Sequence, residues 1–363
     1  MSHWDHPCIV DAAGFAGVWA RDRTDPVLLV MGIGFDPRAC ETLERLIATA
    51  APRRVDLLLV ELPVDSTDLT VRPLVVANRA RAELLTSDAG GTIHVQPLPD
   101  FSDAGSLGRL ISRAFQESNH LDGYREIIIE VSAMSRSVYF PLVRGVLARA
   151  HLDAGQADHW PGDLHVAVCE SPEIDALILE EGTTPMAPIG GFGGAQLRQR
   201  PDTVIWVPVI GERAGARIER LYQELGPSET CPVLPWPARD PRRSDRLVLE
   251  HRTLLFQTIR LEPRNMIHAA ERNPFDLYRT IGELNARYKQ ALAPLGSVGM
   301  VLSSHSSKLL SVGVLLAAYD YELEVQHVSP GTYGLHTSAA HLVPQAEIFD
   351  LWLTGTPYRE AIS

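Results

Sequence analysis

The sequence predicts an α/β protein made of two Rossmann-like domains, each with a mostly parallel sheet. Three observations lead to this fold class. Short apolar runs of Val, Ile and Leu alternate with amphipathic helical patterns along most of the chain, which is typical of a parallel sheet covered by helices on both faces. The chain has 363 residues, enough for about two domains. Its second half also repeats features of the first, which indicates an internal duplication.

The first Rossmann-like domain is expected over residues 1–183. It opens with a buried strand after Pro26, which leads through a glycine-containing turn into a helix. Further apolar strands then alternate with helices, as doubly wound folds require. The expected strands are 26–31, 55–60, 92–95, 126–131 and 164–169, and the expected helices are 38–48, 73–85, 106–118 and 138–150.

A linker is expected over residues 184–202, because four glycines and two prolines fall within 184–195. The alternation then restarts in a second domain, residues 203–363. The expected strands are 203–209, 231–235, 298–302 and 323–328, and the expected helices are 215–225, 244–258, 274–292 and 309–319. One more short helix is predicted at 346–353.

Two segments of the second half repeat segments of the first. At an offset of 172, the junction VSAMSR aligns with SSHSSK, so that Ser132 matches Ser304, Ser135 matches Ser307 and Arg136 matches Lys308. The opening strand VLLVMGIG also recurs as IWVPVIGE, near an offset of 177. We interpret these matches as an internal duplication. A coincidence of two Ser-rich turns is the alternative.

The repeated S-x-x-S-[RK] junction suits the binding of an anion. Each copy lies between an apolar strand and an apolar helix, and ligands of open parallel sheets bind beyond the carboxyl ends of the strands. A helix start there offers unpaired backbone N–H groups and a partial positive charge. Serine hydroxyls add donors, and Arg136 or Lys308 adds a full charge. The alternative is that Ser132, Ser135, Ser304 and Ser307 are only helix caps.

Four further residues around these junctions are candidates for the same site. Gly32 and Gly34 follow the first strand and begin like the dinucleotide fingerprint G-x-G-x-x-G, but Pro37 stands where its third glycine belongs. We therefore expect the glycines to let the turn pass close to a ligand. Arg38 would point into the crevice beside Ser132, or else be a solvated first-turn arginine. His305, inside the second junction, could shuttle protons or stack on a base, or be an ordinary surface or satisfied histidine.

Composition excludes several classes of protein. Only two residues, Lys289 and Lys308, are lysines, and neither follows a glycine, so no Walker A loop is present. The net charge of −12 argues against binding to bulk nucleic acid. The four cysteines stand alone, and no residue pattern suggests a metal site, so neither a metal nor a cofactor is predicted. No apolar run approaches the length of a membrane helix. We expect a cytoplasmic protein without membrane contacts.

The two halves, each with a polar Ser/basic strand-to-helix junction late in the sheet, resemble the CRISPR-associated Rossmann fold (CARF), and are more similar still to its fused tandem relative, the SAVED domain. The resemblance implies a shared pocket that binds cyclic or linear oligonucleotide second messengers. Gly32, Gly34, Ser132, Ser135 and Arg136 would line one half of it, and Ser304, Ser307 and Lys308 the other. Junctions in CARF domains often carry a Thr/Gly-rich turn, whereas EVSAMSRS has no glycine.

Three functions are compatible with these features. The first is a nucleotide-binding sensor or scaffold subunit that acts with a separate effector protein, in prokaryotic antiviral defence. The second is a metal-independent phosphodiesterase that resembles ring nucleases and uses Ser with Lys or Arg to stabilise the transferred phosphate. The third is a protein-only assembly factor. The role of the arginine cluster between Arg239 and Arg246 stays open between a solvated loop and a binding surface.

Overall fold

The computed structural model describes residues 3–4, 6–19, 24–50, 53–61, 71–98, 111, 121–156, 158–193, 201–336 and 346–360. These residues form two compact units. The first unit consists of the described residues between 4 and 181 and of those from 332 onwards. The second unit consists of those between 182 and 331, together with His3. Along the chain, the second unit is therefore inserted between two parts of the first.

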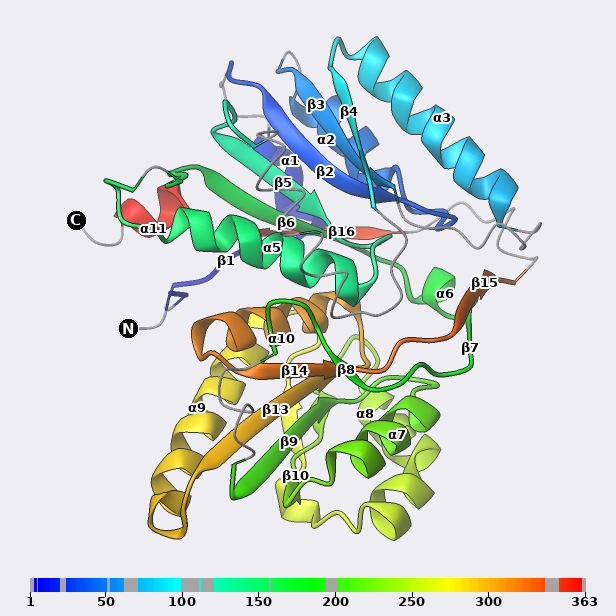
Figure 1. The fold of residues 1–363 in the computed structure, drawn as a ribbon. Helices are drawn as coiled ribbons and strands as arrows, with labels where there is room; N and C mark the ends of the chain where they lie inside the picture. The colour runs from blue at the N-terminus through cyan, green and yellow to red at the C-terminus, as the bar shows by residue number, and fades with distance from the viewer. Residues whose placement is uncertain are drawn as a thin grey trace. The chain divides into compact units, whose positions relative to one another are not determined.

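The first unit contains a seven-stranded sheet with the order β1-β16-β6-β5-β2-β3-β4 (Figure 1). Strands β2 to β6 are parallel, whereas β16 is antiparallel to β6 and β1 is antiparallel to β16. The strands are β1 (Cys8–Val10), β2 (Val27–Ile33), β3 (Val55–Glu61), β4 (Ile93–Pro97), β5 (Glu126–Glu130), β6 (Asp163–Glu170) and β16 (Glu347–Trp352). A separate antiparallel pair, β7 (Ile178–Glu181) with β15 (Thr332–Leu335), lies where the chain leaves and re-enters this unit.

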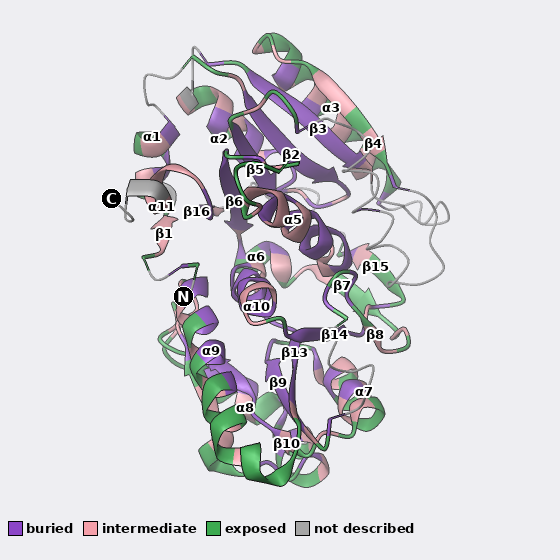
Figure 2. Ribbon diagram, turned by 60° about the vertical axis from the view of Figure 1, so that its left-hand side comes forward, coloured by how far each residue is buried: buried purple, intermediate pink, exposed green. Residues whose placement is uncertain are grey.

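Helices cover both faces of the first sheet. Side chains of α1, α2 and α3 form an apolar core with alternate residues of β2, from Val27 to Ile33. Helix α5 lies on the opposite face, and β2 is buried along its whole length between them (Figures 1 and 2). The helices are α1 (Ala12–Trp19), α2 (Glu41–Ala50), α3 (Arg72–Asp88), α5 (Arg136–Ala150), α6 (Pro172–Asp175) and α11 (Thr356–Glu360).

The second unit contains a sheet with the order β12-β11-β9-β13-β14-β8, and β10 pairs beside β9. All its pairs are parallel except that of β14 with β8. The strands are β8 (Ala187–Pro188), β9 (Thr203–Val209), β10 (Glu229–Thr230), β11 (Val233–Pro235), β12 (Ile267–Ala269), β13 (Val298–Ser304) and β14 (Glu324–His327). The helices are α7 (Gly215–Leu225), α8 (Arg243–Glu250), α9 (Pro274–Leu292) and α10 (Lys308–Asp320), with a π-helical turn Leu254–Thr258 and 3₁₀ turns Pro263–Asn265 and Ala293–Leu295.

The two sheets have the same strand order. In chain order, the five main strands are β2, β3, β4, β5 and β6 in the first unit and β9, β11, β12, β13 and β14 in the second. Numbered in this chain order, the strands of each set lie across the sheet in the order 3-2-1-4-5. In both sheets an antiparallel strand pairs with the outer edge of the fifth strand. This is the Rossmann-like arrangement, so the predicted fold class is confirmed for both units.

Several details differ from the sequence-based boundaries. Residues 346–353, predicted as a helix of the second domain, contain strand β16, whose backbone pairs with β6 of the first unit. The second unit therefore ends near residue 331 rather than at 363. Part of the expected linker 184–202 forms β8, which pairs with β14. The predicted helix 106–118 lies outside the described residues, apart from Ile111.

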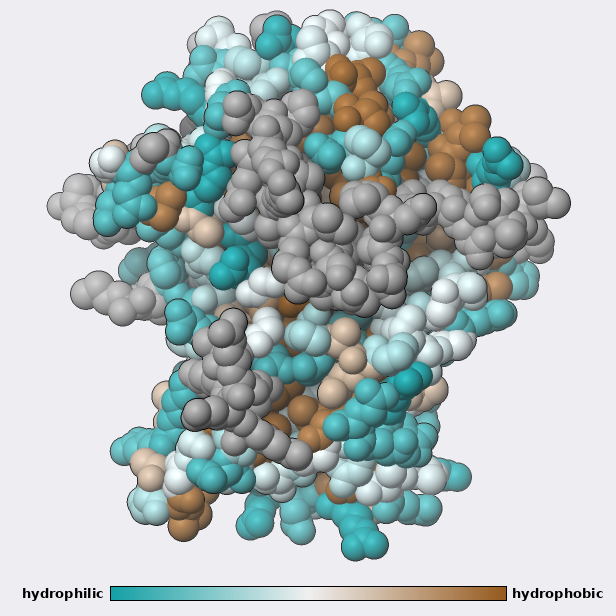
Figure 3. Space-filling view, viewed as in Figure 1, coloured by the Kyte–Doolittle hydropathy of each residue, from teal (hydrophilic) through white to brown (hydrophobic). Residues whose placement is uncertain are grey.

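The outer edge of the first sheet leaves apolar side chains on the surface. Val76 and Leu84 on α3 and Val95 on the edge strand β4 are exposed, and hydrophobic side chains gather there in Figure 3. Within the described ranges, the structure contains no helix that is long and apolar enough to cross a membrane.

Candidate functional site

In each unit, the predicted junction residues lie at the carboxyl ends of the two central strands. The direction of strand addition reverses between β2 and β5 in the first unit and between β9 and β13 in the second. Ligands of open α/β sheets bind in the crevice outside this point. Helix α5 begins at Arg136 and α10 begins at Lys308, so the two aligned cations occupy the same position in their helices.

The turn after β2 is fixed by hydrogen bonds to a neighbouring helix. Gly32 is part of β2, and Gly34 follows its last residue. The side-chain amide of Asn78, on α3, donates to the carbonyl oxygens of Gly34 (2.8 Å) and Asp36 (2.9 Å). The turn is therefore held by a side chain of α3, which occupies two of its backbone carbonyls.

Arg38 is buried, and two carboxylates balance its charge. It is 2% exposed and forms a bidentate pair with Asp36, with Nε–Oδ1 at 3.0 Å and Nη2–Oδ2 at 2.8 Å. Its Nη2 also lies 2.8 Å from Oδ1 of Asp175, and Nη1 donates to the carbonyl of Cys169 at 3.3 Å. The alternative that Arg38 is a solvated first-turn arginine is wrong. Arg38 does point toward the carboxyl ends of the strands, but there it ties the β2 turn to β6 and α6.

Glu130 and Ser132 form a buried polar pair at the end of β5. The backbone N–H of Ser132 donates to Oε1 of Glu130 (2.9 Å), and the Ser132 hydroxyl accepts from the N–H of Cys169 (2.7 Å). Oε2 of Glu130 has no hydrogen-bond partner among the described residues. Burial raises the pKa of Glu130 to about 7, against the opposing effect of the Ser132 hydrogen bonds, and the nearby Asp36 charge adds to the rise. The carboxyl group thus exchanges its proton near neutral pH.

The start of α5 is unusually positive. Ser135 occupies the N-cap position in an extended conformation, but its hydroxyl makes no capping bond and instead contacts the Ser137 hydroxyl at 2.9 Å. Arg136 is the first helical residue and is half-buried, and the first turn contains no acidic side chain. Helix starts normally favour acidic residues, because the macrodipole places positive charge there. The first turn of α5 therefore adds positive rather than negative charge to the positive end of the helix dipole.

The serines of the second junction serve the fold. The Ser307 hydroxyl caps α10 by accepting from the N–H of Leu310 (3.3 Å). The hydroxyls of Ser304 and Ser311 lie 2.8 Å apart, and Ser311 also donates to the carbonyl of Ser307 (2.8 Å). Ser304 is 2% exposed. These bonds correspond to the capping alternative for Ser307, and they place Ser304 inside the packed helix–strand contact.

His305 is also part of the interior. It is 6% exposed, and its Nε2 lies 3.1 Å from the hydroxyl of Ser303, which accepts from the indole N–H of Trp206 (3.0 Å). A Cβ on Gly211 would lie only 1.9 Å from the carbonyl oxygen of His305, so the turns after β9 and β13 touch through their backbones. Of the two readings of His305, the structure favours that of a satisfied, buried histidine.

Lys308 completes the second junction as the first residue of α10. It is half-buried, and the first turn of this helix also lacks acidic residues. The two helix starts therefore share a cation at the first position, a serine at the N-cap and a first turn without acidic residues. Among the described residues, no group of three or more His, Cys, Asp or Glu side chains could hold a metal ion.

Sequence reasoning missed two features of these carboxyl edges. Asp36, Glu130 and Asp175 surround Arg38 and Ser132, yet only the i, i+2 spacing of Asp36 and Arg38 was visible in the sequence. Trp236, directly after β11, is 59% exposed at the carboxyl edge of the second sheet. The sequence signal that could have indicated this exposed ring was a Trp-Pro pair directly after a strand.

Comparisons with known proteins return only distant structural likenesses. No family model and no curated protein match the sequence. Among solved structures, the chain is similar to a protein assigned as a universal stress protein from Pseudomonas aeruginosa UCBPP-PA14, with 14% identity and a TM-score of 0.22 over 84% of this chain and 92% of that one. It is also similar to a universal stress protein from Archaeoglobus fulgidus DSM 4304, with 9% identity and a TM-score of 0.22 over 82% and 94% of the two chains. Likenesses of this size carry no argument about function.

Proposed function

We propose that this chain is a nucleotide-binding sensor or scaffold, which binds phosphate groups at the starts of α5 and α10 and acts through a separate effector protein. The ligand class is that of the CARF and SAVED resemblance, a cyclic or linear oligonucleotide second messenger in prokaryotic antiviral defence. The net charge of −12 fits a small ligand at a local cationic site better than a nucleic-acid backbone.

One observation carries the proposal. Arg136 and Lys308 each stand at the first position of a helix that starts at the reversal point of a Rossmann-like sheet, with no acid in the first turn. A cation at this position opposes the helix macrodipole, typically at a cost of about 0.3–1 kcal/mol. A bound phosphate reverses this penalty, because it interacts favourably with the cation and with the helix start together.

Burial of two hydroxyls of the second junction supports binding without cleavage. In the second junction, His305 contacts the hydroxyl of Ser303, which is 0% exposed and accepts from Trp206. Ser304 is likewise buried against Ser311. Neither hydroxyl can reach a phosphodiester without opening the fold, so these serines are poor nucleophiles. A nucleotide bound at α10 should therefore be recovered intact.

The test exploits the presence of only two lysines in the chain. Lys308→Gln should weaken the binding of a responsive nucleotide by roughly 10- to 150-fold, the range expected for the loss of a charge-assisted hydrogen bond. The matched control is Lys289→Gln, which alters an exposed lysine in the last turn of α9 and should leave the affinity unchanged. Amine labelling read by mass spectrometry should show the ligand protecting Lys308 but not Lys289.

Arg136→Gln provides the same test for the first unit, with the exposed Arg287 of α9 as its control. The panel should contain mononucleotides, cyclic dinucleotides and short linear oligonucleotides, with binding read by calorimetry and ligand integrity by chromatography. Absence of binding by every nucleotide, or unchanged affinity in both Lys308→Gln and Arg136→Gln, overturns the proposal. Recovery of cleaved nucleotide would favour the phosphodiesterase instead.

A further inference from the structure

Trp236 differs from every other tryptophan of the chain in its exposure. Of the six tryptophans, all of them described, five are at most 6% exposed, whereas Trp236 is 59% exposed. The five buried rings are those of Trp4, Trp19, Trp160, Trp206 and Trp352. The one described contact of the Trp236 ring with another aromatic ring is with His268, whose plane is nearly perpendicular (78°) at a centroid distance of 6.2 Å. An exposed indole is a large apolar surface that a planar ligand can cover.

The strand register places Trp236 on the same edge as the α10 junction. Val233 of β11, Val209 of β9 and Ser304 of β13 are paired across the sheet. Trp236 lies three residues beyond Val233, and Ser307 lies three residues beyond Ser304. Since one strand separates β11 from β13, Val233 and Ser304 are about 10 Å apart, and the chain leaves both strands at the same carboxyl edge. This separation is comparable to that between a base and a phosphate within a short nucleotide.

Two arginines near Trp236, Arg239 and Arg242, have guanidinium groups that pair with no carboxylate of the described chain. Within the described chain, the guanidinium groups of Arg239 and Arg242 make no hydrogen bond or close ion pair, although the charge of Asp240 acts on Arg242. Both side chains are exposed. The other arginines of the cluster are neutralised: Arg243 pairs with Glu212 and Glu271, and Arg246 pairs with Asp240. The loop from Trp236 to Arg242 therefore combines an exposed aromatic ring with two exposed guanidinium groups, although the backbone N–H groups of Arg239 and Arg242 donate to Glu271 and Asp240.

We propose that Trp236 stacks on the base of a nucleotide ligand in the second unit, while Arg239 and Arg242 contact a phosphate of the same ligand. This inference rests on the proposed function, because it takes the ligand to be a nucleotide. It adds that the base of this nucleotide lies within reach of α10. Stacking on an aromatic side chain accepts any base, whereas arginine contacts select for phosphate. The site thus requires both parts of a nucleotide rather than phosphate alone.

The probes that test this are AMP, the dinucleoside monophosphate ApA, ribose 5-phosphate and inorganic phosphate. Trp236→Ala should weaken AMP and ApA roughly 5- to 150-fold, the range of base–aromatic stacking, while leaving any binding of ribose 5-phosphate unchanged. Trp236→Phe should recover most of the affinity. Because Trp236 is the exposed tryptophan, the iodide-quenchable fluorescence should come from it, and AMP should protect it.

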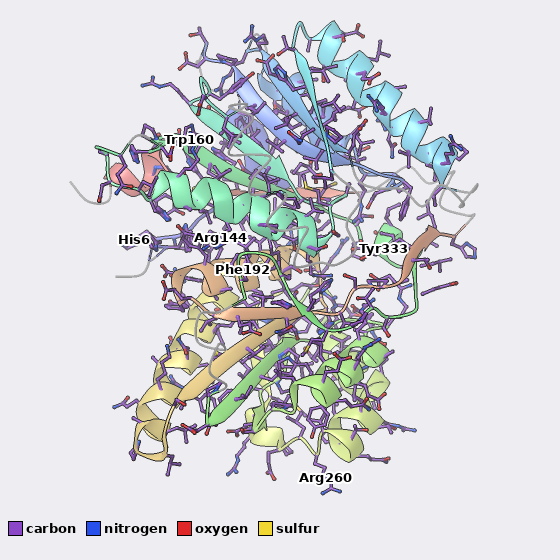
Figure 4. All side chains as sticks on the ribbon, in the orientation of Figure 1. His6, Arg144, Trp160, Phe192, Arg260 and Tyr333 are labelled. Atoms are coloured by element: carbon purple, nitrogen blue, oxygen red, sulfur yellow. The ribbon has the colours of Figure 1, made fainter. Side chains whose placement is uncertain are left out.

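Matched controls lie at the opposite edge of the same unit. Helix α8 leads away from the carboxyl edge, so the residues between it and β12 lie near the amino ends of the strands; Figure 4 labels Arg260 in this segment. Phe256→Ala removes an aromatic ring that is 41% exposed, and Arg260→Asn removes an exposed arginine at a positive φ of 56°. Neither should change AMP affinity, whereas Arg239→Gln and Arg242→Gln should each weaken it.

The outcomes separate this inference from the proposed function. Loss of affinity in Lys308→Gln with none in Trp236→Ala overturns the stacking role and leaves the α10 phosphate site. Loss in Trp236→Ala with none in Lys308→Gln supports the stacking site and removes α10 from it. If Trp236→Ala weakens AMP and ribose 5-phosphate equally, the ring does not contact the base. Unchanged iodide quenching at saturating AMP also contradicts the inference, because a stacked indole cannot stay accessible.

Discussion

Glu130 is a side chain at the candidate edge whose pKa its surroundings raise strongly. Burial raises the pKa of this carboxyl group to about 7, whereas an unfolded glutamate titrates near pH 4.3. Between these two values the folded protein retains a proton that the unfolded chain has already released. The free energy of unfolding therefore falls as pH rises through this interval, by an amount on the order of 3 kcal/mol from this group.

Glu130→Gln should remove that pH dependence, because glutamine resembles the protonated carboxyl and keeps an oxygen to accept from Ser132. Urea unfolding between about pH 4.5 and 7.5 should give a shallower fall in stability for the variant than for the unmodified chain. Glu219→Gln, at an exposed position on α7, serves as the control and should follow the unmodified curve. A Glu130→Gln curve of stability against pH that runs parallel to that of the unmodified chain would contradict the effect of burial on the pKa of Glu130.

Single residues also show which features local sequence could predict and which it could not. Helix starts close to Arg136 and Lys308 were predictable, because a polar, serine-containing turn between two apolar runs signals a helix start; the observed helices begin two residues and one residue before the predicted ones. The partners of Arg38 were not, because Asp175 and Cys169 reach it only through the parallel pairing of β5 with β6. Local spacing carries no information about such contacts.

At the scale of elements, the turn after β9 depends on the absence of a side chain at one position. A Cβ on residue 211 would lie 1.9 Å from the carbonyl oxygen of His305, which is too close for any side chain. Only glycine therefore permits this contact between the two strand-to-helix turns. The contact also continues the β9–β13 ladder, since the N–H of His305 donates to the carbonyl of Val209 (2.9 Å). The junction before α10 is therefore positioned by the neighbouring strand as well as by its own cap.

Gly211→Ala should destabilise the protein by at least about 2 kcal/mol, because backbone must move to accommodate the methyl group. Gly145→Ala is the opposite case: this glycine lies within α5, and its added Cβ meets nothing within 4 Å. We expect a gain of about 0.5–1 kcal/mol there, from helix propensity. Thermal and urea denaturation of the two variants should move in opposite directions, and a stable Gly211→Ala protein would refute the backbone contact.

At the scale of the whole molecule, the chain returns to its first unit after completing the second. Strand β16 pairs with β6 and carries Asp350, which is 1% exposed and accepts from Nε1 of Trp19 (3.1 Å) and from Nδ1 of His165 (2.9 Å). This carboxylate connects the last strand to α1 and β6. The first sheet is therefore completed only by residues that follow the second unit.

Asp350→Asn should lower the free energy of unfolding by about 2–3 kcal/mol, because the amide cannot accept equally from both buried donors. The loss should be visible in a urea titration followed by tryptophan fluorescence, since Trp19 is among the buried rings. Asp88→Asn, at the exposed end of α3, should stay within about 0.5 kcal/mol of the unmodified chain. Equal stabilities of the two variants would show that the Asp350 contacts do not hold β16.

The sequence by itself determined most of the succession of main strands and helices and the Rossmann-like class of both halves, and it placed a cation close to each of two helix starts, because apolar periodicity and helix-start signals act over a few residues. It missed strand β12, which is only three residues long. Tertiary structure alone decided that residues 346–353 form a strand of the first sheet, that Arg38 is neutralised and that Trp236 is exposed. These depend on which backbone edge is left to pair and on which charges and rings the packing brings together. Such contacts join positions far apart along the chain, where no local pattern records them.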